Sequence, residues 1–495
     1  MSSLKLRDAN GSIAMKLCDF DEFLFEIAQS RKSQGDTILK FPFNKSRCRI
    51  LSKTTEIIES AKGVLYWMSR DCRIHDNWAL LYAQRLALKN KQPLYVCFTL
   101  FEAYYQYPTR RHQRFLLDGL KCVDEQCKSI NVKFYLLQAS PSNLAQLVKE
   151  NNLGAVVCDF TPLKQPCKWL SVFLEKVPFD IPVIQVDAHN IVPAWILSDK
   201  QEVMARTLRP KINKNLPEYL TGFPEVTKHP YKGKLINIPL VEPVIQKVSW
   251  DIPEIPDIKA GEREGFKMLH TFLQERLRHY GITSNDPSLN QTSNLSFWLN
   301  FGHISAQRVA LEVQSLENVH KLPVDRFLEE LIVRRELADN YCLYNNNYDN
   351  IKGAAEWAQK TLLDHAIDKR NYIYSRREFE MAKTHDLIWN AAQKQLRVEG
   401  KIHGYMRMYW CKKILEWTES PDKALEIALW LNDVYALDGN DPNGFVGVMW
   451  SICGVHDQGW KERKIFGKIR YMVDYSLKRK FNIKAYCDQY LNEKS

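Results

Sequence analysis

Five short apolar runs between Gly63 and Asp187 constrain the fold more than any other feature of the sequence. They read GVLYWM, PLYVCFT, VKFYLLQ, GAVVCDF and IPVIQVD, and all are rich in β-branched and aromatic residues. Segments with helical periodicity, such as NWALLYAQRLALKN and PSNLAQLVKENN, separate them. Fully apolar strands that alternate with helices predict a parallel, doubly wound, five-stranded sheet. We therefore expect an α/β domain in this part of the chain.

The rest of the chain divides by composition and periodicity. Residues 1–40 are mixed and polar, with one amphipathic patch, DFDEFLFEIAQ, and predict a helical extension before the α/β domain of residues 41–190. Residues 191–260 contain nine prolines and few periodic segments, which predicts an inter-domain linker on the surface. Residues 261–495 repeat the helical period without strand-like alternation, so we expect a larger all-α domain there.

Length and composition limit the class of protein. A chain of 495 residues with 45% hydrophobic and 26% charged residues is typical of a globular protein with two or three domains. The net charge of +11 favours a polyanionic partner, but the charge alone is weak evidence, since such an excess also promotes solubility. The twelve cysteines form no CxxC pair, which favours reduced thiols and predicts no metal site. Without a signal peptide or an apolar run of membrane-spanning length, an intracellular protein, nuclear or cytoplasmic, is expected.

An unusual stripe lies in the segment from Trp389 to Trp450. Thr384 is expected to cap a helix that ends at Gly400, and a second helix is predicted from about Ile402 to Glu416. One face of the second helix carries His403, Arg407, Trp410, Ile414 and Trp417. The stripe is either a core with large aromatics or a functional surface. Its guanidinium needs a counter-ion, because an unpaired buried charge is costly, and Asp438 is the expected partner.

Two further segments are candidates for ligand binding. Residues 293–296 precede a helical run, where they either cap the helix or bind phosphate through free amides and hydroxyls. The turn SRDCRIHDNWAL follows the first predicted strand, at the sheet edge where doubly wound folds bind ligands, but it also fits an ordinary loop. No glycine-rich dinucleotide fingerprint is present, which disfavours a nicotinamide enzyme.

Four motifs give the sequence a specific resemblance. The runs KTHDLIWNAA, MRMYWCKKILEW, LDGNDPNG and MWSICGVHDQGW resemble the class II cyclobutane-pyrimidine-dimer DNA photolyases, and the similarity extends from about Phe41 to Phe481. It implies an all-α domain that binds FAD and an α/β antenna domain that can hold a second chromophore, a deazaflavin or a folate. It also implies a monomeric enzyme that repairs cyclobutane pyrimidine dimers in DNA by electron transfer from photoexcited reduced FAD.

The same resemblance leaves one alternative function. A cryptochrome-like photoreceptor shares the fold and the flavin but signals to a protein partner. Signalling members usually carry a long C-terminal tail, whereas this sequence ends about fourteen residues after Phe481, which favours the enzyme.

The resemblance assigns roles to individual residues. The FAD contacts it implies are Tyr280, Thr292, Ser293, Asn294, Leu295, Ser296, Arg407 and Asp438, with Asn432 beside the isoalloxazine. The residues it places at the lesion are Glu330, Met408 and Trp450, and it places Trp460 in the gap left by the flipped dimer. In a flavin pocket the Glu330 carboxyl is expected to be desolvated, with a raised pKa, and to donate a hydrogen bond to a pyrimidine carbonyl.

Three indoles match the electron relay of the class II enzymes, in the order Trp410, Trp389, Trp417 from the flavin outward. Trp410 and Trp417 lie seven residues apart on one helix, roughly 10 Å along its axis, so Trp389 on the preceding helix is expected to bridge them. The alternative is that the three rings only pack the helix pair.

The chain departs from the family pattern at several positions. Ser284, Phe297 and Asn300 stand where Arg, Pro and His are usual, which predicts altered flavin contacts. Gln458 stands where many members have Arg, close to Trp460.

Overall fold

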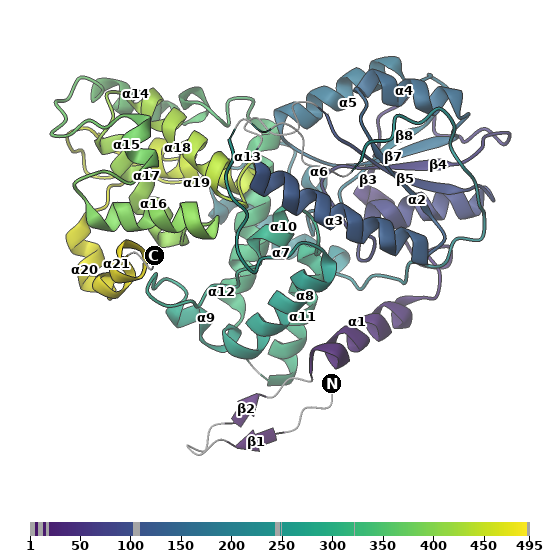
Figure 1. Cartoon of the computed structure of the whole chain (residues 1–495), viewed down its shortest axis with the longest axis horizontal. Helices are drawn as coiled ribbons and strands as arrows, with labels where there is room; N and C mark the ends of the chain where they lie inside the picture. Colours follow the sequence, from purple (N-terminus) through teal and green to yellow (C-terminus); the bar gives the residue numbers. More distant parts are fainter. Residues whose placement is uncertain are drawn as a thin grey trace.

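The computed structural model describes residues 5–7, 13–15, 19–101, 109–242, 248, 250–320 and 322–492. An α/β half and a larger helical half lie side by side in it (Figure 1). No helix within the described ranges combines the length and the apolarity needed to cross a membrane. All cysteines in these ranges are free thiols.

The α/β half is built on a six-stranded sheet in the order β3-β8-β7-β4-β5-β6. The five predicted strands are present and parallel: β4 (Val64–Met68), β5 (Leu94–Thr99), β6 (Lys133–Leu137), β7 (Ala155–Asp159) and β8 (Val183–Val186). The prediction of a five-stranded, purely parallel sheet was wrong, because β3 (Cys48–Ile50) pairs antiparallel with β8 at one edge. With three residues and a half-buried, half-buried, exposed pattern, β3 has no strand signal in its sequence.

Helices cover both faces of the sheet, as a doubly wound fold requires. They are α2 (Trp78–Lys89) and α3 (Arg110–Ser129) on one face and α4 (Pro141–Glu150) and α5 (Lys164–Lys176) on the other (Figure 1). Val64 and Tyr66 of β4 belong to a core that continues into the helical half, whereas Leu65 and Trp67 pack with residues of α4 and α5. The strand order places the topological switch point between β4 and β7.

The N-terminal extension contains one long helix, α1 (Phe20–Gln34), which includes most of the predicted amphipathic patch. Phe23 and Ile27 of α1 are buried, and Arg31 pairs with Asp76 at 2.8 Å and with Glu262 of α8 (Glu262–Glu275) at 3.2 Å. Two short strands, β1 (Lys5–Arg7) and β2 (Ile13–Met15), pair antiparallel before it. The rest of the predicted extension before α1 lies outside the described residues.

The proline-rich segment contains two helices, α6 (Ala194–Leu197) and α7 (Ala205–Tyr219). Pro210 and Pro217 lie inside α7, while Leu208 and Ile212 of the same helix are buried. This part of the segment therefore packs on the core in addition to connecting the two halves. The domain boundaries themselves stay a prediction.

The helical half extends from α8 to the C-terminal region, and its described residues form no β-sheet. Its further elements are α9 (Leu277–Thr283), α10 (Ser296–Asn300), α11 (Ala306–His320), α12 (Asp325–Leu328), a π-helix (Glu329–Arg334), α13 (Arg335–Tyr344), α14 (Glu356–Asp364), α15 (Arg376–Glu380), α16 (Leu387–Glu399), α17 (Gly404–Glu416), α18 (Pro421–Tyr435), α19 (Pro442–Cys453), α20 (Asp474–Lys480) and α21 (Ile483–Leu491).

Two helix starts differ from expectation. Asp386, not Thr384, caps α16, because its carboxylate accepts the N–H groups of residues 388 and 389, while Thr384 Oγ1 donates to Asn390 Oδ1 at 2.8 Å. His403 is the N-cap of α17 and not part of its buried stripe; its Nε2 lies 3.0 Å from the Ser284 carbonyl. The predicted end of α16 at Gly400 is confirmed, with a left-handed φ of 65°.

Candidate functional site

Two adjoining cavities open in the helical half. The larger, of about 850 Å³, is bounded by the turn of residues 292–297, residues 398–404 and α17. The smaller, of about 320 Å³, is bounded by Tyr280, the π-helix and the start of α19. Both are lined by Ser293, Ser296, Arg407 and Asp438. The cavities therefore meet at residues that the sequence singled out, and together they offer an elongated site.

Arg407 forms the centre of this junction. Its Nη2 lies 3.6 Å from Asp438 Oδ1, and its Nη1 donates a hydrogen bond to Asn432 Oδ1. The predicted pairing of Arg407 with Asp438 is thus confirmed. Asp438 Oδ1 is buried and has no hydrogen-bond partner within the described protein, so the pair leaves an acceptor free at the cavity wall.

A buried carboxyl stands behind Asn432. Asn432 Nδ2 donates to Asp433 Oδ1 at 2.9 Å, and the same oxygen accepts the Asn440 N–H at 3.0 Å. Burial raises the pKa of Asp433 to about 6. The side-chain amide of Asn432 is therefore held from both ends, by Arg407 and by Asp433, in a single orientation.

The turn before α10 is organised around Asn294. Thr292 Oγ1 donates to Asn294 Oδ1 at 2.9 Å, and Asn294 adopts a left-handed φ of 60°, which Asn tolerates better than most residues. The helix that follows has only five residues, so its dipole contributes little and the expected helix-start site for phosphate is weakened.

Lys401 supplies the charge that the short helix lacks. Its Nζ contacts Asn294 Oδ1 at the wall of the larger cavity, and burial lowers the pKa of Lys401. Sequence analysis missed this residue. The only signal was a Lys directly after the helix stop at Gly400 and three residues before α17.

Glu330 lies in the π-helix, a rare local distortion that is frequent at functional sites. Tyr280 donates its hydroxyl hydrogen to Glu330 Oε2, and Arg326 Nε lies 3.3 Å from Oε1. Burial raises the pKa of Tyr280, so it stays a hydroxyl donor. The expected desolvation of Glu330 is not observed: the residue lines the smaller cavity, but 45% of its side chain is exposed.

Arg335 was also missed. It is buried beside the smaller cavity, where its Nη2 donates to the His189 carbonyl at 3.1 Å while Nη1 has no partner within the described protein. Burial lowers the pKa of Arg335. A buried guanidinium with a free donor suits an anionic group in the cavity. Little in the sequence signals its burial, because three consecutive charged residues, Arg334 to Glu336, are typical of a solvated helix face.

The three indoles form a continuous row. Trp389 stacks on Trp410 at 6.2 Å between ring centroids with an interplanar angle of 5°, and its ring lies 6.2 Å from Trp417 at 66°. The expected bridging position of Trp389 is confirmed. Trp389 Nε1 donates to the Trp410 carbonyl at 3.0 Å, and Trp410 Nε1 donates to Gln393 Oε1 at 2.9 Å. Trp417 lines a separate cavity of about 1100 Å³ near α20 and α21.

Met408 and Trp450 are half-buried on α17 and α19. Trp460, which follows α19, is 46% exposed, and the guanidinium of Arg470 lies 4.8 Å above its ring. The three residues thus come from neighbouring segments of the C-terminal part of the chain.

Comparison with known proteins decides the family. A family model described as DNA photolyase matches residues 64–230. A deoxyribodipyrimidine photo-lyase of Potorous tridactylus is 48% identical over 468 residues, which cover 92% of this chain and 86% of that protein. A deoxyribodipyrimidine photo-lyase of Oryza sativa subsp. japonica is 46% identical and covers 86% of each chain. This chain belongs to the DNA photolyase family.

A solved structure shows the same architecture. The cryptochrome of Synechocystis sp. PCC6803 superposes with a TM-score of 0.68 at 14% identity, over 89% of this chain and 90% of the cryptochrome. At this identity the likeness shows the shared fold alone.

The departures of this photolyase from its family pattern have local structural roles. Asn300 Nδ2 donates to the carbonyls of Leu437 and Gly439 at 3.3 and 3.1 Å, and so holds the loop that carries Asp438. Phe297 is buried in the core. Ser284 is buried with an unpartnered Oγ, where an Arg would need a counter-charge.

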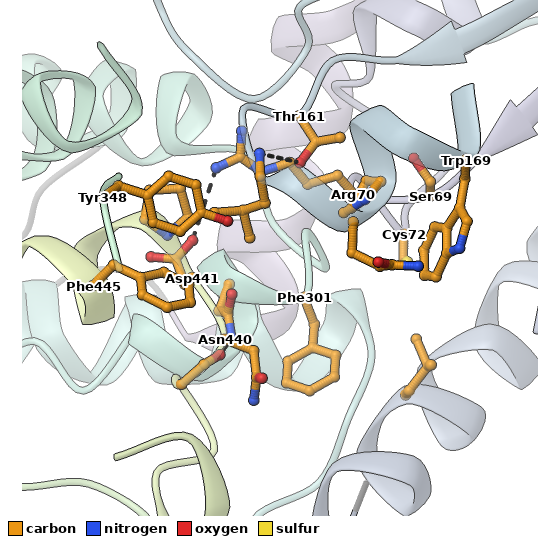
Figure 2. A pocket seen from close by; sticks show the side chains of 17 residues that line it. Ser69, Arg70, Cys72, Thr161, Trp169, Phe301, Tyr348, Asn440, Asp441 and Phe445 are labelled. Carbon is orange, nitrogen blue, oxygen red and sulfur yellow. Dashed lines mark hydrogen bonds and ion pairs between the residues drawn. The ribbon is translucent and has the colours of Figure 1, made fainter. Parts of the chain in front are cut away.

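A further cavity of about 170 Å³ lies at the switch point of the photolyase sheet, between the two halves. Figure 2 shows Tyr348, Phe445 and Phe301 on its helical side and Trp169 across from them. Arg70, two residues after the end of β4, lines it and pairs with Asp339 at 2.7 Å and Asp441 at 3.8 Å. The turn that the sequence placed at this edge therefore does line a cavity.

Proposed function

We propose that this chain is a deoxyribodipyrimidine photo-lyase that repairs cyclobutane pyrimidine dimers in DNA in a light-dependent reaction. The observation that carries the proposal is the junction of two cavities at Arg407, with a row of three close indoles beginning one turn further along the same helix. The names of relatives that are 46–48% identical over most of the chain support the same reaction.

The residues of the two cavities fit FAD. Their volumes, about 850 and about 320 Å³, each lie in the range of cofactor sites, roughly 300–1,000 Å³. Lys401 on the larger cavity and the free Nη1 of Arg335 on the smaller one lie to either side of Ser293 and Ser296, and a diphosphate bound there would favour the charged form of both side chains. Tyr280, Leu295 and Asp438 complete the proposed contacts. When bound, reduced FAD supplies the electron that opens the cyclobutane ring after it absorbs light.

The protein contributes geometry and electrostatics. The amide of Asn432, clamped between Arg407 and Asp433, is proposed to fix the protonation state of the cofactor's ring edge. Glu330, oriented by Tyr280 and Arg326, is proposed to face the pyrimidine carbonyls. DNA that covers the exposed Glu330 side chain would exclude water, so that its hydrogen bond to a pyrimidine carbonyl would be stronger than in open solvent.

Met408 and Trp450 are proposed to contact the extruded dimer, and Trp460 the gap that it leaves in the duplex. An apolar, aromatic pocket suits a fused pyrimidine pair, which stacks poorly and is therefore cheap to flip out. The cavity at the switch point is proposed to hold the antenna chromophore, a deazaflavin or a folate. Its aromatic lining and the ion-paired Arg70 suit a flat ring with polar edges.

Binding to damaged DNA tests the proposal. We expect a duplex with one cyclobutane dimer to bind at least about tenfold more tightly than the undamaged duplex, because flipping the dimer costs less. Both affinities should fall steeply with salt, as phosphate contacts of a protein with a charge of +11 require. Trp450→Ala should remove most of the preference without changing the salt dependence.

Titrations of labelled duplexes at several salt concentrations measure both quantities. Lys461→Gln, which changes an exposed cation after Trp460, is the matched control, since it should weaken binding to both duplexes equally. Equal wild-type affinity for the two duplexes at every salt concentration would rule out the lesion pocket.

A further inference from the structure

A strained hairpin, residues 460–468, follows α19. Trp460 N–H donates to the Lys468 carbonyl at 2.8 Å, and Arg463 and Gly467 exchange both backbone hydrogen bonds at 2.9 and 2.7 Å. At its tip Ile465 has a φ of 69°, an outlier for a β-branched residue. Such a conformation persists only where the surroundings hold it in place.

The end of α14 and the loop after it hold this hairpin. Ile465 N–H donates to Asp368 Oδ2 at 2.7 Å, and Lys468 N–H donates to Thr361 Oγ1 at 3.0 Å. The fit at Gly467 is so close that an added Cβ would lie 2.1 Å from Thr361 Oγ1. The strained residue is thus tied directly to a carboxylate on another element.

His365 joins this carboxylate to the hairpin. Its Nδ1 lies 2.6 Å from Asp368 Oδ2, and its Nε2 lies 2.9 Å from Glu462 Oε1. A neutral imidazole has one N–H and can donate to only one of these carboxylates, whereas the protonated ring donates to both. Hydrogen bonds to Asp368 and Glu462 accordingly raise the pKa of His365, and hydrogen bonds from Ile465 and His365 lower the pKa of Asp368.

The charged groups around His365 are few. Arg370 Nη1 donates to the His365 carbonyl at 3.3 Å, and the pair of Lys360 and Asp364, 3.9 Å apart, precedes it on α14. On the hairpin side, Glu462 is the acidic residue that contacts the ring. The exposed hairpin cations are Lys461, Arg463, Lys464 and Lys468, with Arg470 above the exposed ring of Trp460.

We propose that His365 is a positioning residue for DNA binding: its protonated ring ties Glu462 to Asp368 and so fixes the hairpin that presents Trp460 and its neighbouring cations to the damaged duplex. The proposal rests on the proposed repair function. It goes further because it assigns the shape of the DNA-contacting hairpin to a residue that itself need not touch DNA.

The direction of the pH dependence follows from the ion pairs. The folded-state pKa of His365 lies above its ordinary value. Both hydrogen bonds of the protonated ring are therefore present at a pH below that ordinary value, and one of them is lost as the pH rises through the folded-state pKa. The neutral ring keeps only one of its two hydrogen bonds. Either Glu462 is released, and its charge then repels phosphate, or Asp368 loses a donor and fixes the strained Ile465 less firmly. DNA affinity should therefore fall at alkaline pH.

The first experiment measures the affinity for dimer-containing duplex from about pH 6 to about pH 9 at constant ionic strength. Wild-type affinity should fall by about three- to tenfold across the transition, the scale of one charge-assisted hydrogen bond partly coupled to binding. His365→Gln should bind weakly and without the transition. Glu462→Gln should move the midpoint to lower pH, because one of the two carboxylates that raise the pKa is gone.

Lys461→Gln is the control: it removes a hairpin cation without touching either hydrogen bond of His365, so it should weaken binding and leave the midpoint in place. A wild-type pH profile retained in His365→Gln would overturn the proposal, and so would an unmoved midpoint in Glu462→Gln.

The second experiment needs no DNA. It therefore tests whether the hydrogen bonds of His365 to Asp368 and Glu462 fix the hairpin, independently of the proposed repair function. Hydrogen exchange of the free protein should show the amides of residues 461–468 losing protection as the pH rises, after correction for the intrinsic rate. The same amides should be poorly protected at every pH in His365→Gln. Equal protection in the wild type and His365→Gln throughout the pH range would refute the proposed role of His365 in fixing the hairpin, even if the protein repairs DNA.

Discussion

Trp389→Phe is expected to abolish light-driven reduction of the oxidised cofactor while leaving repair by chemically pre-reduced protein intact. Trp389 is the one ring of the row that contacts both Trp410 and Trp417, at 6.2 Å in each case. Without it, a hole on Trp410 would have to cross a separation of roughly 10 Å along α17. Phenylalanine is far harder to oxidise than tryptophan, so it fills the space without carrying the hole.

The surroundings of the three indoles favour movement of the hole from ring to ring over its trapping on one ring. The N–H groups of Trp389 and Trp410 are held by a carbonyl and an amide oxygen, neither of which is a base strong enough to take the proton. The hole therefore stays mobile until it reaches Trp417 beside the cavity near α20 and α21. Loss of the Trp389 hydrogen bond and of part of a buried indole should cost roughly 1–3 kcal/mol of folding stability, which the protein is expected to tolerate.

The measurement is the absorbance of bound FAD during illumination with an external thiol present. Trp430→Phe is the matched control, because Trp430 is also buried but packs against Trp250, outside the row. This control should photoreduce at the wild-type rate. If Trp389→Phe does so as well, the three indoles are packing residues and the relay lies elsewhere.

Glu330→Ala is expected to give the second large effect: normal FAD content with a much lower repair yield per absorbed photon. Its carboxyl is held in one orientation by Tyr280 and Arg326 and faces the smaller cavity. Removal of a preorganised donor from the site where negative charge develops costs about 2–4 kcal/mol in the barrier. Glu330→Gln, which retains a donor, should lose less.

Repair yields should be compared at saturating damaged duplex with pre-reduced protein. Glu329→Gln is the matched control: Glu329 is the neighbour in the π-helix, but its carboxylate pairs with Arg209 at 2.8 Å. It should repair at the wild-type yield. An unchanged yield in Glu330→Ala would remove this carboxyl from the mechanism.

The parts of the fold with a strong local pattern could be predicted from the sequence. All five apolar runs became the parallel strands of the sheet, because burial of most of their residues leaves a continuous hydrophobic signal. Edge strand β3 escaped prediction, since antiparallel pairing at an edge needs no such signal. Asp386 and Thr384 are both good caps, and only the three-dimensional hydrogen bonding decides between them.

The parts of the candidate site whose geometry depends on residue spacing along a helix could be predicted from the sequence. The helical spacing of Trp410 and Trp417 required a third ring, and Arg407 required a counter-ion; the structure supplies Trp389 and Asp438. Lys401 and Arg335 escaped because their importance depends on burial against distant segments, around Asn294 and His189. The exposure of Glu330 was misjudged, since the sequence does not reveal which face of a π-helix stays open.

Repair of a single cyclobutane dimer in a duplex, with and without blue light, tests the central claim most directly. Purified protein should be loaded with FAD, reduced chemically and mixed with the damaged duplex. We expect intact pyrimidines to be restored in the illuminated sample, in proportion to the absorbed photons, and no repair in the dark. Protein that binds FAD and photoreduces it, yet leaves the dimer unchanged under illumination, would contradict the account and favour a photoreceptor that signals to another protein.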